Sequence, residues 1–280
     1  MNLNKKLFFI LTGTALISCQ QEDSPTEYSA PKTTAQLESI EKRQDSIIQE
    51  HLKEGAWKYS YYSPEWQEEI DKGLAKDSTI AYLWQQKAMP LFKQGKYEIG
   101  MPYLDKAVKY NRRQWQDYRA FMKCIFSKTY RAAIVDFKDY QKRFGSGHVM
   151  DHSYDFYIAL SYLQLNEFHK AEILFKSIHE TQLSKNGKEW LHPVELFYYG
   201  ISKFEQAKYL EANELFDLAL TLHDQFSDVQ YYKAMCLSKM EKREEAKELM
   251  AIAEKNGKDG FSLNEDNAFY ERYPYQVRWR

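Results

Sequence analysis

Five segments of the chain share one spacing of small and large residues, and this repetition constrains the fold more than any other feature. In each segment a small residue is followed four positions later by a large apolar one, and the small residue recurs after 33, 38, 41 and 34 residues. Four segments carry a second small residue twelve positions earlier, and Phe121 replaces it in the other. The pairs are Ala88 and Gly100, Phe121 and Ala133, Ala159 and Ala171, Gly200 and Ala212, and Ala234 and Ala246.

This pattern resembles the tetratricopeptide repeat, which has a period of about 34 residues and small residues where its two helices cross. Trp84 and Tyr162 stand at the family's tryptophan and tyrosine positions, whereas its closing proline is missing, with Asn111 or Asp224 nearby instead. The resemblance implies an all-α tetratricopeptide-type solenoid of about five helix–turn–helix repeats. The alternative is an irregular all-helical domain in which the small residues coincide by chance.

The repeats are expected over residues 79–260. Their approximate ranges are 81–114, 114–147, 152–185, 193–226 and 227–260. Two insertions, "RFGSGHVMD" and "TQLSKNGKEWLHP", lengthen the second and third spacings and are expected to form loops. Residues 34–78 predict a degenerate N-terminal helical hairpin, whose second helix starts at Ser63-Pro64. Residues 261–280 predict a C-terminal cap: a short helix from the capping box at Ser262 to Arg272, then an extended tail.

The first nineteen residues indicate where the protein is located. Twelve uncharged residues, 7–18, precede Cys19 and end in Leu16-Ile17-Ser18; they are too few to span a bilayer but typical of a secretory signal. Leu16-Ile17-Ser18-Cys19 resembles the lipobox of bacterial lipoproteins, in which the cysteine is acylated. The resemblance implies a signal peptide over 1–18, a lipid on Cys19 and a flexible tether over 19–33. Because Gln20 is not aspartate, it also implies an outer-membrane address, with the periplasmic or surface face left open.

Charge and motifs exclude several functions. Without Lys5 and Lys6 the chain has 37 basic and 40 acidic residues, so no basic excess indicates nucleic-acid binding. His148 and His152 lack the glutamate that a zinc-protease motif needs, and no nucleophile elbow or phosphate-binding loop occurs. We therefore expect no enzyme activity, cofactor or metal. In the repeat register Cys124 and Cys236 lie three repeats apart, too far for a disulfide, and are expected as buried thiols.

One group of aromatic residues is left for binding. The family resemblance places them on the first helices, which line a concave groove. A density of exposed aromatics marks a surface for a protein or peptide partner, although a one-residue register error would move several into the core. The candidate groove residues are Tyr82, Phe92, Trp115, Tyr118, Phe126, Phe156, Tyr157, Phe197, Tyr198, Phe204, Tyr231 and Tyr232.

These observations predict a non-catalytic, lipid-anchored scaffold of the cell envelope that binds a protein or peptide. The alternatives are a glycan-capture or nutrient-uptake component, or an accessory lipoprotein of outer-membrane assembly. The apolar tail "YPYQVRWR" leaves a further choice open. It packs along the last repeat as part of the cap, or it lies in the aromatic groove and competes with the ligand.

Overall fold

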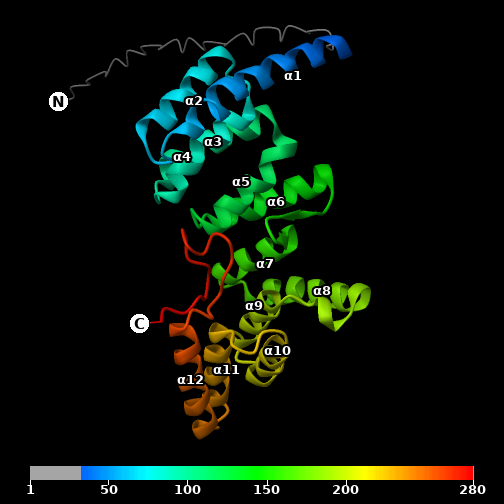
Figure 1. Ribbon diagram of the computed structural model, residues 1–280. Helices are drawn as coiled ribbons and strands as arrows, with labels where there is room; N and C mark the ends of the chain where they lie inside the picture. Colours follow the sequence, from blue (N-terminus) through cyan, green and yellow to red (C-terminus); the bar gives the residue numbers. More distant parts are fainter. Residues whose placement is uncertain (1–32, 280) are drawn as a thin grey trace, which may run out of the picture. The chain divides into compact units, whose positions relative to one another are not determined.

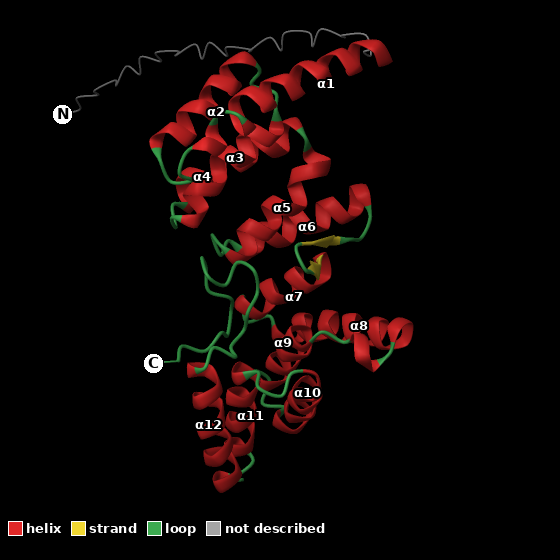
Figure 2. Ribbon diagram, in the orientation of Figure 1, coloured by secondary structure: helices red, strands yellow, loops and turns green. Residues whose placement is uncertain are grey.

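The computed structural model describes residues 33–279. The predicted signal peptide, the lipid site at Cys19 and the tether up to residue 32 lie outside this range. Residues 42–280 make one compact unit, and the boundary with residues 1–41 falls inside helix α1 (Thr34–Ile48). In Figure 2 the described elements are helices joined by loops, apart from one short pair of strands.

Consecutive helices pack in pairs along the compact unit (Figure 1), which confirms the all-α repeat prediction. Five such pairs follow residue 80 in the described part of the chain. The pairs are α3 (Ala81–Lys93) with α4 (Tyr97–Tyr110), α5 (Arg112–Ile125) with α6 (Tyr130–Phe144), α7 (Tyr154–Gln164) with α8 (Phe168–Asn186), α9 (Pro193–Phe204) with α10 (Tyr209–Leu222), and α11 (Ser227–Lys239) with α12 (Arg243–Lys258).

Small residues sit where the two helices of a pair cross. A Cβ atom on Gly100 of α4 would lie 2.8 Å from the Phe92 ring of α3, and one on Gly200 of α9 would collide with the Phe216 ring of α10. Ala171 and Ala212 are fully buried at the equivalent places. The close approach of the helices therefore explains the twelve-residue spacing found in the sequence.

The region before the first pair has its own small core. Helix α1 continues as a π-helix (Gln49–Lys53), followed by a 3-10 turn (Ala56–Lys58) and helix α2 (Pro64–Lys76). The Ser63 hydroxyl caps α2 by accepting a hydrogen bond from the Trp66 N–H, as the sequence predicted. The buried side chains of this core are Ile47, Leu52, Ala56, Trp66, Ile70, Leu74, Ile80 and Leu83.

The two insertions are more ordered than the loops expected from the sequence. The first forms a small antiparallel hairpin of β1 (His148–Val149) and β2 (His152–Ser153). Part of the second extends α8 to 19 residues, and a 3-10 turn (Lys188–Trp190) follows. Within residues 33–279 no helix is long and apolar enough to cross a membrane.

The predicted C-terminal capping helix is wrong. Residues 261–272 form successive turns, in which Ala268 bonds back to Glu265 and Tyr270 to Asn267. The capping box fails because its parts have other partners. The Leu263 N–H donates to the Asp228 carboxylate, and the Glu265 side chain turns to His152. The expected extended tail also turns, because the Gln276 N–H bonds to the Tyr273 carbonyl.

Candidate functional site

The last residues of the chain cross the first helices of the repeats. We call residues 261–279 the C-terminal loop, and the face built from α3, α5, α7, α9 and α11 the first-helix surface. In Figure 1 the loop, in red, leaves α12, runs past α7 toward α5 and α6, and returns. Its contacts reach three of the helix pairs directly, at α3, α9 and α11. It reaches the second pair through the α5–α6 turn and the third through His152 of β2, which precedes α7.

Asp228, in the first turn of α11, holds both ends of the loop. Its carboxylate accepts hydrogen bonds from the Leu263 N–H at 2.8 Å and the Val277 N–H at 2.6 Å. The Gln276 amide closes the base further by donating to the Leu263 carbonyl at 3.1 Å. Burial raises the pKa of Asp228, although these backbone donors favour its charged form. One buried carboxylate thus joins the first and the last segment of the loop.

The middle of the loop enters the core. Tyr273 is 3% exposed and packs in the main hydrophobic cluster. The Tyr198 hydroxyl, on α9, donates to the Pro274 carbonyl at 2.8 Å. The hydroxyl of Tyr157, on α7, is buried and has no hydrogen-bond partner. Burial, with a smaller effect of Tyr273, raises the pKa of Tyr157 well above its usual value. The site therefore includes one polar group that the loop does not satisfy.

The tip of the loop reaches the first two helix pairs. Glu271 pairs with the Lys128 ammonium at 2.7 Å and accepts a hydrogen bond from the Tyr97 hydroxyl. Burial opposes ionisation of Glu271, but these donors outweigh it and lower the pKa. The Lys93 ammonium lies 4.4 Å from the centre of the Tyr270 ring. The tip therefore presents an acidic side chain to a basic and hydroxyl-bearing corner of the repeats.

His152 makes a further attachment between the loop and the repeats. It is fully buried and lies between Glu195 of α9 at 3.1 Å and Glu265 of the loop at 3.3 Å. Burial alone would lower the pKa of His152, but the two carboxylates outweigh it and raise the pKa to about 9. From the sequence we found no metal-binding motif at His152 and expected no site there. Its two acidic partners are 43 and 113 residues away in sequence, so local reasoning could not find them.

The twelve aromatic residues proposed for the groove fall into two classes. Six are buried in the core, because the helix register turns their rings toward neighbouring helices: Phe92, Phe126, Phe156, Tyr157, Phe197 and Tyr198. Six are partly exposed: Tyr82, Trp115, Tyr118, Phe204, Tyr231 and Tyr232. Of these, Tyr231 contacts Trp279 and Tyr232 contacts Tyr275 of the loop. Binding of a partner by the partly exposed six stays a prediction.

The partly exposed aromatics nearest the N-terminal half form a group that we call the open aromatic cluster: Tyr61, Tyr82, Trp115 and Tyr118. The Tyr82 and Trp115 rings stack at 6.0 Å, and Trp115 meets Tyr118 edge-on at 5.8 Å. The Lys93 ammonium lies 5.2 Å from the centre of the Tyr61 ring, and it also contacts the Tyr270 ring of the C-terminal loop. The cluster thus shares Lys93 with the tip of the C-terminal loop.

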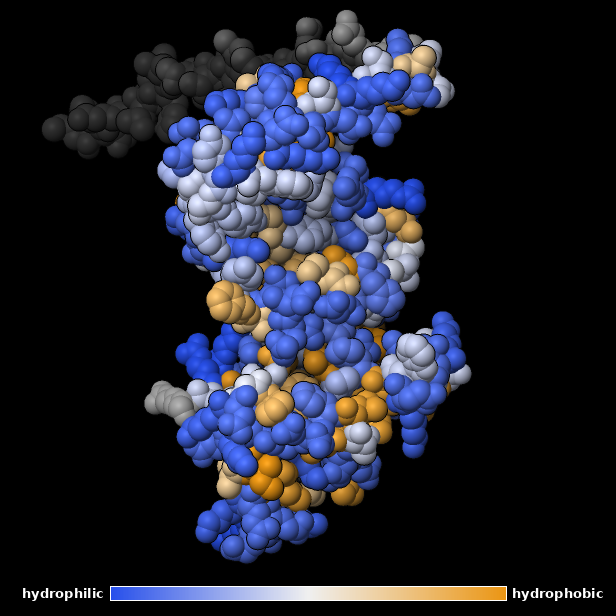
Figure 3. All heavy atoms as spheres, in the orientation of Figure 1, coloured by the Kyte–Doolittle hydropathy of each residue, from blue (hydrophilic) through white to orange (hydrophobic). Residues whose placement is uncertain are grey.

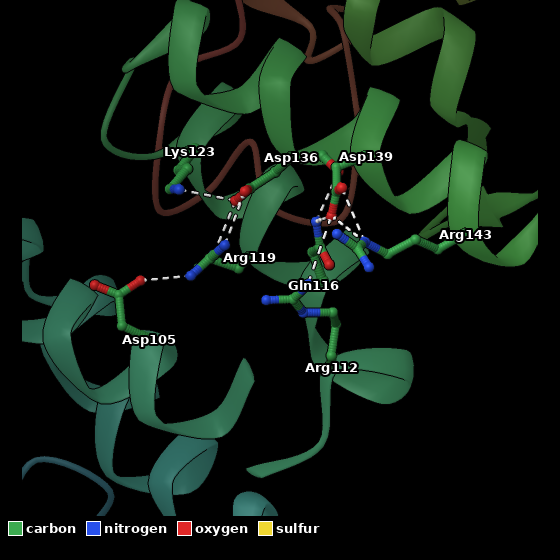
Figure 4. A network of polar contacts seen from close by, with 8 residues as sticks. All are labelled: Asp105, Arg112, Gln116, Arg119, Lys123, Asp136, Asp139 and Arg143. Atoms are coloured by element: carbon green, nitrogen blue, oxygen red, sulfur yellow. Dashed lines mark hydrogen bonds and ion pairs between the residues drawn. The ribbon is translucent and has the colours of Figure 1, made fainter. Parts of the chain in front are cut away.

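A polar network joins the first two repeats (Figure 4). Arg119 of α5 bonds to Asp105 of α4 and makes two bonds to Asp136 of α6, and Lys123 also reaches Asp136 at 2.8 Å. Opposite charges pair throughout, so the network fixes three helices rather than offering a reactive group. Among residues 33–279, no group of three or more histidine, cysteine, aspartate or glutamate side chains could hold a metal. Cys124 and Cys236 are free and buried, as predicted.

The exterior is mostly hydrophilic in the view of Figure 3, with the largest apolar patches around α10 and α11. Sequence analysis missed the residues that hold the loop. Asp228, Lys128 and Glu271 look like ordinary charged residues in the sequence, and their pairing depends on where the chain returns. The alternation of apolar residues after Tyr273 was the one available signal, and it indicated burial of the tail without indicating the surface that it covers.

Comparison with known proteins gives the fold. A tetratricopeptide repeat protein from Parabacteroides merdae superposes with a TM-score of 0.59 at 15% identity, over 80% of this chain and 81% of that one. PilW, a widely conserved type IV pilus biogenesis factor, superposes with a TM-score of 0.56 at 10% identity, over 78% of this chain and 94% of that one. The C-terminal part of a tetratricopeptide repeat-containing protein from Cytophaga hutchinsonii superposes with a TM-score of 0.54 at 15% identity, over 78% of this chain and 80% of that one. No protein-family model and no curated protein matches the sequence.

Proposed function

We propose that this chain, a tetratricopeptide-type solenoid, is a lipid-anchored scaffold that binds a protein or peptide partner in the cell envelope. The lipid is attached at Cys19, and the address is the outer membrane. The lipobox-like Leu16-Ile17-Ser18-Cys19 supports the anchor, and solved proteins of this fold support a scaffold rather than an enzyme.

The open aromatic cluster is the observation that carries the binding role. Its four rings belong to two consecutive helix pairs and the segment before them, and they remain partly exposed although three of them stack in a row. The Trp115 indole N–H has no hydrogen-bond partner. Partly exposed tyrosine and tryptophan are the side chains that contribute most to protein–protein binding energy. A partner that covers this cluster would bury the exposed parts of these aromatic rings.

Cross-linking in intact cells, followed by capture from solubilised membranes, tests the role. Trp115→Ala should remove the captured partner. Trp190→Ala is the matched control, because Trp190 is 69% exposed and lies far along the chain in the α8–α9 connection. Equal capture by the two variants would exclude the open aromatic cluster as the binding surface.

A further inference from the structure

The first-helix surface already holds one peptide, the C-terminal loop, and it does so partly through the peptide backbone. Asp228 accepts the N–H groups of Leu263 and Val277, and Tyr198 donates to the Pro274 carbonyl. Side chains that bind main-chain groups hold an irregular peptide in one register without requiring a particular sequence.

The same surface also selects side chains. Lys128 and Tyr97 bind the Glu271 carboxylate, and the hydrophobic core receives the Tyr273 ring. Pro274 follows at once, with its carbonyl on Tyr198. The accepted order is therefore an acidic residue, any residue, an aromatic residue and a proline.

The loop satisfies this surface incompletely. The Tyr157 side chain is 0% exposed and its hydroxyl has no partner, next to the place where Tyr273 enters the core. The indole N–H of Trp279 is buried without a partner as well. Unsatisfied buried polar groups each cost stability, so another peptide that offers an acceptor to Tyr157 would fit better.

The covered surface continues into an uncovered one. Lys93 lies over both the Tyr270 ring of the loop and the Tyr61 ring of the open aromatic cluster. Beyond Tyr270 the loop turns back, and Phe269 at this turn is 89% exposed. A ligand longer than the loop would occupy the loop's place and extend past Lys93 onto the aromatic rings.

We infer that the surface beneath the C-terminal loop is a peptide site, and that its ligand is a segment of another protein with an acidic residue two positions before an aromatic-proline pair. This inference rests on the proposed scaffold function. The loop is then a tethered competitor, because a segment attached to its own binding surface acts at an effective concentration in roughly the millimolar range.

The test uses the full-length chain and a fluorescent synthetic peptide with the sequence of residues 264–279. Glu271→Gln combined with Tyr273→Ala is designed to release the loop without substituting any residue of the repeats. Fluorescence anisotropy should show that the peptide binds this release variant at least about tenfold more tightly than the wild type. Phe269→Ala is the matched control, since the exposed Phe269 ring does not hold the loop, and it should bind like the wild type. Val277→Pro, which removes one N–H bound by Asp228, serves if Tyr273→Ala fails to fold.

Exchanging the charges of the ion pair between Lys128 and the Glu271 position of the peptide tests whether the site selects an acidic residue. Lys128→Glu in the release variant should weaken peptide binding at least about tenfold, and a peptide with lysine at the Glu271 position should restore it. Equal affinity of the peptide for the wild type and the release variant would overturn the inference, as would no binding to a release variant that remains helical. Concentration-dependent dimers of the wild type would also overturn it, since the ligand would be a second copy. Partner capture that still depends on Trp115 in any of these cases would leave the proposed function intact.

Discussion

Ala212 is the residue at which the helix crossing is most directly tested. It is fully buried in α10 where that helix meets α9. Ala212→Arg forces a long charged side chain into a space that fits a methyl group, so we expect a loss of more than about 3 kcal/mol in the free energy of unfolding.

Urea unfolding followed by circular dichroism measures this loss. Ala251→Arg is the control, because Ala251 is exposed on α12 and the same change there should cost less than about 0.5 kcal/mol. Similar unfolding midpoints for the two variants would contradict the repeat register.

His152 makes stability depend on pH. Its pKa is about 9 in the folded chain and about 6.5 when unfolded, since Glu195 and Glu265 stabilise its charged form. Below pH of about 6.5 both states hold the proton, and the stabilisation is fully present. As pH rises through about 9 the folded state must release a proton that the unfolded state has already lost, so the stabilisation disappears.

The urea midpoint should therefore fall between pH of about 6.5 and about 9.5, and His152→Gln should flatten this fall. Asp151 and His192 also face this site, and the lowered pKa of His192 puts its titration below that window. The exposed His169 supplies the control, and His169→Gln should keep the wild-type slope. If His152→Gln keeps it too, another group is responsible.

At the scale of helices, Glu172 joins α8 to the α9–α10 region. Its carboxylate accepts hydrogen bonds from Lys203 at 2.6 Å, Lys208 at 2.7 Å and Gln206 at 2.6 Å. Burial disfavours the charge, but these donors outweigh it and lower the pKa of Glu172 to about 2. A lowered pKa means that the stabilisation is present above pH of about 4.5 and is lost as pH falls toward 2.

Glu172→Gln should reduce the free energy of unfolding by about 1–3 kcal/mol at neutral pH, and it should reduce the loss of stability between pH of about 4.5 and about 3. Denaturant unfolding over this range measures both effects. The comparison is with Glu180→Gln, whose carboxylate is exposed on the same helix and pairs only at 3.7 Å with Lys176. An acid response identical in the two variants would show that the Glu172 cluster contributes nothing.

The helices were predictable because their determinants are local. The spacing of Gly200 and Ala212 depends only on the crossing of the two helices of one pair, and Ser63 caps the helix that directly follows it. The predictions that were wrong depended on contacts between residues far apart in the sequence. The helix expected from Ser262 to Arg272 does not form, since Asp228 holds the Leu263 N–H and the Glu265 side chain pairs with His152 instead of capping the helix. Likewise, a rotation of about 100° per residue decides whether an aromatic ring lines the surface or the core, and spacing alone does not fix that rotation.

At the scale of the whole molecule, membrane attachment depends on Cys19, which lies outside the described residues. Cys19→Ala should abolish acyl labelling and leave the protein unanchored or uncleaved, because two or three lipid chains on one residue anchor a protein stably and none can then be attached. Cell fractionation and labelling with a fatty-acid analogue measure the outcome. Cys124→Ala is the control, since that thiol is buried. Unchanged membrane attachment and mobility of Cys19→Ala would refute the lipoprotein interpretation.

The C-terminal loop connects helix pairs that are distant in sequence, so its removal should destabilise regions far from the chain end. Deleting residues 273–280 removes the buried Tyr273 ring, the Pro274 carbonyl on Tyr198 and the Val277 N–H on Asp228. The melting temperature should fall by several degrees, because each lost kcal/mol lowers it by about 2–4 °C in a chain of this size.

Hydrogen exchange locates the effect. Protection should decrease in α7, α9 and α11 and in the turn around Lys128, which loses its contact with Glu271 once the loop is no longer held. Helix α2 packs against α3 and the segment before it. It provides an internal control, for which we expect unchanged exchange. If the loop were only a cap on the last repeat, exchange would increase in α11 and α12 alone. That pattern would mean that the chain end stabilises its neighbours without occupying the first-helix surface.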